Sequence, residues 1–181
     1  MKKFEEIKFN IGELKGLSAK NIEEHLKLYA GYVKNTNLLL EKTEPQTRFG
    51  FEFNGMRNHE YYFKSLEGGA KNLPENSQLK TAIEKTQPFD VWLTNFKTLA
   101  MTRGVGWAVL YWDKQTKQFI DAWVDEHHLG QLNGLSWILG IDMWEHAFVA
   151  DYLPSGKKQY IEDFFANLNW EVIEENFKQA Q

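Results

Sequence analysis

Apolar side chains recur every three or four residues through the first half of the chain, which is the spacing of one face of an α-helix. Ser18 precedes the first such stretch and suits the N-cap position, because its hydroxyl can accept a hydrogen bond from the backbone. A polar segment at 35–37 predicts a bend within that stretch. The pattern predicts four helices, at roughly 19–42, 50–66, 76–86 and 89–103.

The spacing changes at Gly104, after which β-branched and aromatic residues dominate. Two such runs, at 105–112 and 119–124, flank a polar segment at 113–117 that is typical of a hairpin turn. A third run at 137–141 completes an antiparallel meander of three strands. Helical spacing then returns, at about 145–153, 157–167 and 170–179.

This grouping of helices, strands and helices predicts an α+β protein. We expect an N-terminal helical hairpin domain at 1–85. It is followed by a C-terminal α/β domain at 86–181, in which a three-stranded antiparallel sheet packs with helices. A chain of 181 residues is long enough for one domain or for two small ones that share an interface.

Charge and composition exclude several classes of function. The net charge of −4 provides no overall basic field, so neither nucleic acid nor a membrane surface is an expected partner. The chain has no cysteine, which excludes disulfides, thiolate metal sites and a cysteine nucleophile. Acidic residues occupy the start of the chain, where a signal peptide needs an apolar stretch, so a cytoplasmic location is expected.

A carboxylate and an imidazole stand four residues apart at Asp142 and His146, after a predicted strand. If the backbone turns helically there, the two side chains face the same way and can share a cation. The alternative is a salt-bridged surface turn. The neighbouring residues are mostly apolar and aromatic, and a charge buried among them needs a partner or a metal.

Two further histidines, His25 and His59, each lie on the apolar side of a predicted helix. Each by itself could be a core histidine with a satisfied hydrogen bond. Together with Asp142 and His146 they make three imidazoles and one carboxylate, a donor set that suits iron, manganese, zinc or copper better than calcium or magnesium.

These residues resemble those of the iron/manganese superoxide dismutases, and the resemblance covers nearly the whole chain. The block from Asp142 to Ala147, which reads D-M-W-E-H-A, carries most of it. The resemblance implies one iron or manganese ion per chain, held by His25, His59, Asp142 and His146 and cycling between the 3+ and 2+ states. It also implies superoxide as the substrate and a homodimer as the assembly.

The residue that hydrogen-bonds the metal's solvent ligand departs from the usual pattern of that family. A glutamine that hydrogen-bonds the metal's solvent ligand is common, either four residues before the second ligand or after the second strand. Gly55 occupies the first position, and the second region has no glutamine. Some members use a histidine there, and His127 lies at the matching offset before Asp142, so we assign that hydrogen bond to His127.

The resemblance gives roles to several aromatic and acidic residues. Tyr32 matches the tyrosine beside the metal, but the segment from His25 to Tyr32 is one residue shorter than usual. Compared with the usual spacing in that family, this deletion turns Tyr32 by roughly 100° about the helix axis relative to His25, for a regular helix. The residues expected around the metal ligands are Trp107 and Trp144 as pocket walls, Tyr62, and Glu145, which would bond the partner subunit's counterpart of His146.

Three alternatives stay open at this point. A nonheme iron oxygenase leaves several metal positions free, and a third histidine would fill one of them. A non-catalytic relative would bind the metal without turnover, and a structural zinc site would be closed and four-coordinate.

Overall fold

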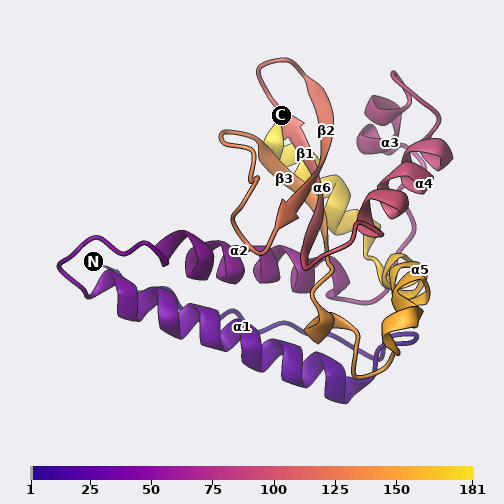
Figure 1. Cartoon of the computed structure of the whole chain (residues 1–181). Coiled ribbons are helices and arrows are strands. Elements are labelled where there is room, and N and C mark those ends of the chain that lie inside the picture. The colour runs from indigo at the N-terminus through magenta and orange to yellow at the C-terminus, as the bar shows by residue number, and fades with distance from the viewer. Residues whose placement is uncertain (1) are drawn as a thin grey trace.

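Two long antiparallel helices form the N-terminal part of the computed structural model, which describes residues 2–181. They are α1 (Ala19–Leu40) and α2 (Phe49–Leu66), and they lie side by side (Figure 1). The Ser18 hydroxyl accepts a hydrogen bond from the backbone N–H of Asn21 at 3.1 Å, which confirms the expected N-cap.

The bend predicted at 35–37 was wrong, because α1 continues through this segment. Asparagine opposes a helix mainly when its side chain bonds the local backbone. Here the side chain of Asn35 donates to Glu52, and that of Asn37 exchanges hydrogen bonds with the backbone of Phe4. Both asparagines therefore have partners outside the helix and leave its backbone intact.

The predicted antiparallel meander is confirmed, with strand order β2-β1-β3. The strands are β1 (Gly106–Asp113), β2 (Gln118–Asp125) and β3 (Ser136–Asp142). The central strand β1 is buried along nearly its whole length, as its unbroken apolar run requires. Its register sets Trp107 opposite Asp142, so the start of β1 and the end of β3 lie at the same end of the sheet.

Helices from both halves of the chain pack against the sheet. Helix α4 contacts β1 and β2, whereas α2 and α6 both contact β3. Among residues 2–181, no helix has the length and apolar character that crossing a membrane requires. The remaining elements are α3 (Gln78–Ile83), α4 (Phe89–Ala100), η1 (Glu145–Ala147), η2 (Pro154–Gly156), α5 (Lys157–Asn167) and α6 (Trp170–Ala180).

The helix predicted over 145–153 was wrong, since only the short 3₁₀ turn η1 forms there. Phe148, the residue that ends η1, has a φ of −142°, which lies outside the helical region. The backbone N–H of Trp144 donates to the Asp142 carboxylate at 2.8 Å, which fixes the chain immediately before η1. A tight turn therefore replaces a helix at this point.

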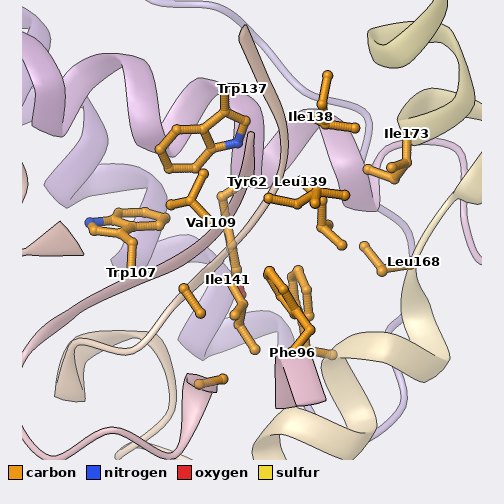
Figure 2. Close-up of a cluster of buried hydrophobic side chains, with 14 of the residues drawn as sticks. Tyr62, Phe96, Trp107, Val109, Trp137, Ile138, Leu139, Ile141, Leu168 and Ile173 are labelled. Atoms are coloured by element: carbon orange, nitrogen blue, oxygen red, sulfur yellow. The ribbon is translucent and has the colours of Figure 1, made fainter. Parts of the chain in front are cut away.

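One buried core joins the helical hairpin to the sheet. Figure 2 shows Tyr62 of α2, Phe96 of α4 and Ile141 of β3 in the same cluster. Large aromatic side chains supply much of this apolar volume. The α+β architecture is thereby confirmed, and the domain boundary expected near residue 85 stays a prediction.

Candidate metal centre

Four ligand-type side chains converge from four separate elements. They are His25 on α1, His59 on α2, Asp142 at the end of β3 and His146 in η1. One potential ligand atom from each lies within 4.8 Å of the corresponding atoms of the others. The Nε2 atoms of His25 and His146 both lie 3.2 Å from Oδ2 of Asp142, and that of His59 lies 3.5 Å from it.

The fold explains this convergence. The antiparallel packing of α1 and α2 brings the rings of His25 and His59 to a centroid separation of 4.9 Å. The sequence predicted that a helical turn would align Asp142 with His146. The chain instead leaves β3 and forms η1, and this strand-to-turn geometry brings the same two side chains together.

The donor atoms fit a bound cation. The ring Nδ1 of His59 lies 2.6 Å from the Gly55 carbonyl, which can only accept a hydrogen bond, so Nδ1 carries the proton. The lone pair of His59 is then on Nε2, which is buried and has no hydrogen-bond partner within residues 2–181. Nitrogen and carboxylate donors together are typical of sites for iron, manganese, zinc or copper.

Burial sets the charges of these groups. It lowers the pKa of His25, and it lowers that of His59 well below the usual histidine value, with the neighbouring His25 adding to the effect. Both imidazoles are therefore neutral and available as ligands at neutral pH. Burial by itself would raise the pKa of Asp142, but His146 and His25 beside it hold that pKa far below the usual range, so the carboxylate is ionised.

His127 is buried beside this cluster, and both of its ring nitrogens have hydrogen-bond partners. The indole Nε1–H of Trp107 donates to Nδ1 at 3.0 Å, and Nε2 lies 2.6 Å from the hydroxyl of Tyr32. An indole can only donate, so the proton of a neutral His127 must be on Nε2. Burial lowers the pKa of His127 to about 4, which keeps the ring neutral at neutral pH.

The hydrogen bonds therefore have a defined direction. His127 Nε2–H donates to Tyr32 Oη, and the hydroxyl hydrogen of Tyr32 is left for an acceptor elsewhere. The centroids of the Tyr32 and His59 rings lie 5.1 Å apart, and Tyr32 is on the side of α1 that faces the cluster. Seven residues of regular α-helix close nearly two turns, about 700°, so His25 and Tyr32 share one face of α1.

Gly55 provides the space that Tyr32 occupies. A Cβ atom at position 55 would lie 2.7 Å from Cδ1 of Tyr32, closer than packed carbon atoms approach. Any side chain on α2 at this point would therefore displace the Tyr32 ring. The glycine and the shorter spacing between His25 and Tyr32 are geometrically matched.

The other residues expected around the ligands lie at the site. The Trp144 ring stacks on that of His127 at 4.7 Å, and its indole donates to the Glu126 carbonyl. The ring of Tyr62 lies 5.1 Å from that of His25. Glu145 is exposed on η1, next to His146, which suits a contact outside this chain.

Sequence reasoning missed two residues of the site. The Tyr160 hydroxyl donates to the backbone carbonyl of Asp142 at 2.8 Å. The Phe51 ring packs against that of His127, with the ring centroids 4.8 Å apart. Both follow the apolar spacing of a helix, so the sequence marks them only as core residues. Their proximity to the ligands arises from the packing of α5 and α2.

Comparison with known proteins identifies the family. Residues 74–176 match the family described as iron/manganese superoxide dismutases, C-terminal domain. The chain belongs to the iron/manganese superoxide dismutase family. It is 31% identical to an iron superoxide dismutase of Aquifex pyrophilus, over 92% of this chain and 87% of that protein.

Further relatives in this family carry other metals in their names. A superoxide dismutase of Aeropyrum pernix, named for manganese or iron, is 30% identical over 86% of this chain and 80% of its own length. A manganese superoxide dismutase of Haloferax volcanii is 27% identical over 84% of this chain and 82% of its own length. Iron and manganese are thus both represented among the relatives.

The space at Gly55 can be tested with the variant Gly55→Ala. Replacing glycine by alanine within a helix is worth up to about 1 kcal/mol of stabilisation. The clash with Tyr32 opposes this gain, and overpacking costs about 1–3 kcal/mol. Chemical denaturation should therefore show a lower free energy of unfolding for Gly55→Ala than for the wild type.

Gly31→Ala is the matched control. It lies next to Tyr32 on α1, and among the described residues nothing lies within 4 Å of its added Cβ atom. This variant should equal or exceed the wild-type stability. Equal stabilisation by both substitutions would contradict the claim that Gly55 makes room for Tyr32.

Proposed function

We propose that this chain is a superoxide dismutase that uses one iron or manganese ion. Two superoxide anions and two protons are converted into one dioxygen and one hydrogen peroxide. The observation that carries this conclusion is the convergence of three imidazoles and one carboxylate, in a chain of the dismutase family. When bound, the ion supplies one-electron redox chemistry between its 3+ and 2+ states.

The roles of the four ligands follow from their charges. His25, His59 and His146 would each provide a neutral nitrogen, and Asp142 provides the negative charge. One carboxylate compensates only part of the charge of a divalent or trivalent cation, so the site would be locally positive with the ion bound. This local charge would attract the superoxide anion, although the chain as a whole has a net charge of −4.

Tyr32 and His127 would handle protons, and we assign them as the catalytic residues beside the metal. Peroxide formation requires protons at the site, and the hydroxyl hydrogen of Tyr32 is free to be donated there. His127 holds that hydroxyl through its Nε2–H at 2.6 Å. The direct solvent hydrogen bond expected of His127 stays a prediction, and it would require His127 to give up its present hydrogen bond to Trp107 or to Tyr32. Trp107 and Trp144 would orient His127, through the indole hydrogen bond and the ring stacking, whereas Tyr62 would wall the pocket beside His25.

Metal reconstitution tests the proposed function. Metal-free protein should be loaded separately with iron, manganese and zinc, and superoxide removal measured per bound ion. We expect activity with both iron and manganese and none with zinc, because zinc is not redox-active. Full occupancy by iron and manganese without turnover would identify a non-catalytic relative. An inactive iron form beside an active manganese form would reject the use of both metals.

Substitutions test the assignment of the proton-handling pair. His127→Ala and Tyr32→Phe should retain the metal, because neither side chain belongs to the ligand cluster. Turnover should fall about 10- to 100-fold, as is typical when a residue that supports a metal site is removed. His128→Ala serves as the control on the adjacent histidine and should behave like the wild type. If His127→Ala also behaves like the wild type, His127 has no role in turnover.

Three broader expectations belong to this proposal. The chain would act as an antioxidant enzyme, it would form a homodimer, and the cytoplasmic location stays a prediction. Exposed Glu145 next to His146, and Val149 with 47% of its surface exposed, support an interface on the η1 face.

Sedimentation of Glu145→Ala tests the dimer. Two identical contacts across a twofold axis would be lost, so the dimer should weaken about tenfold or more. Glu75→Ala removes an exposed carboxylate elsewhere and should leave the dimer unchanged. A wild-type protein that sediments as a monomer would contradict the proposal.

A further inference from the structure

Gln131 lies in the loop after β2, four residues beyond His127, and is partly buried. We propose that Gln131 is a positioning residue, whose side-chain amide holds the backbone of His127 so that the imidazole meets both Trp107 and Tyr32. This inference rests on the proposed function, because it gives His127 its orientation beside the metal.

Two side-chain amides converge on the backbone carbonyl of His127. Nε2 of Gln131 and Nδ2 of Asn58 each donate to this oxygen at 3.1 Å. The same Nε2 of Gln131 lies 3.1 Å from Oδ1 of Asn58, so the two amides also bond to each other. A carbonyl oxygen has two lone pairs, and both are used here. The carbonyl is thus held between α2 and the loop after β2.

Tyr111 determines which way the Gln131 amide points. The hydroxyl of Tyr111, a buried residue of the central strand, donates to Oε1 of Gln131 at 3.0 Å. With Oε1 directed at this donor, Nε2 is directed at the acceptors on His127 and Asn58. The hydrogen bonds therefore run from Tyr111 through Gln131 to His127, and they anchor the loop to the middle of the sheet.

The His127 segment needs such an anchor because its backbone makes a tight reversal. Glu126 has a φ of +51°, in the left-handed region that non-glycine residues rarely adopt. Asp125 and Leu129 close the reversal with two backbone hydrogen bonds of 2.9 and 3.2 Å. The His127 ring must then reach Trp107 and Tyr32 at once, and a displacement of about 1 Å is enough to break such an arrangement.

Gln131 has two routes to the site, through the His127 carbonyl and through Asn58, the residue before the ligand His59. Its hydrogen bonds go to Tyr111, Asn58 and the His127 carbonyl, and none goes to a metal ligand or to Tyr32 in the described chain. It also lines an open cavity of about 430 Å³ on the side that includes Tyr61 and Trp137. Removing the Gln131 amide would open the His127 carbonyl to water from this cavity.

Two substitutions isolate the hydrogen bonds of Gln131. Gln131→Met keeps the length of the side chain and removes the amide without adding a charge. Gln131→Glu keeps an acceptor for Tyr111 but has no donor for His127 or Asn58. Gln115→Glu makes the same charge change in the exposed turn after β1 and is the matched control. Tyr111→Phe removes only the hydroxyl that orients Gln131 and should have a smaller effect of the same sign.

Four measurements on the iron-loaded protein test the proposal: iron content, turnover, the reduction potential and the electron paramagnetic resonance spectrum of the ferric form. For Gln131→Met we expect unchanged iron content and about a three- to tenfold loss of turnover, the scale of one or two hydrogen bonds. The potential and the spectrum should shift in both Gln131 variants and stay unchanged in Gln115→Glu.

A double variant decides whether the effect passes through His127. In a His127→Ala background, Gln131→Met should cause no further change in potential or spectrum. Additive changes in the double variant, or an unchanged potential and spectrum in both Gln131 single variants, would overturn the positioning role. These two readouts do not depend on turnover, whereas an inactive wild-type enzyme would count against the proposed function alone.

Discussion

The buried carboxylate of Asp142 is the constraint on which the rest of the site depends. It is fully buried and ionised, and its hydrogen-bond neighbours His25 and His146, with His59 close by, come from three other elements. As metal ligands the three imidazoles would be neutral and would not balance this negative charge, and an unbalanced buried charge costs several kcal/mol. A bound cation removes this cost, so the ion would stabilise the junction of α1, α2, β3 and η1 as well as supply the chemistry.

The orientation of His127 and Tyr32 beside the ligands follows from Trp107, whose indole can only donate a hydrogen bond. The indole of Trp107 fixes the neutral form of His127 with its proton on Nε2, and this proton in turn fixes the hydroxyl of Tyr32. Trp107 lies opposite Asp142 in the sheet register. The same pair of strands thus places a metal ligand and the residue that sets the direction of the neighbouring hydrogen bonds.

Three local features of the chain around the ligands are compatible in this fold. The shorter segment between His25 and Tyr32 keeps both side chains on one face of a regular α1. This position directs the Tyr32 ring against α2, where Gly55 leaves room for it. The Tyr32 hydroxyl then reaches the imidazole of His127, 2.6 Å away. Each feature fits the geometry that the other two produce.

Local spacing in the sequence determined the two long helices, the three strands and the residue types of the four ligands, because periodicity and capping act over a few residues. It failed at 35–37 and at 145–153, where contacts with Phe4 and Glu52 and the turn after Asp142 decide the backbone. Only the tertiary structure decided that Tyr160 and Gln131 contact the backbone of Asp142 and His127. Such contacts join residues that a local pattern treats as independent, since the packing of separate elements alone brings them within hydrogen-bonding distance.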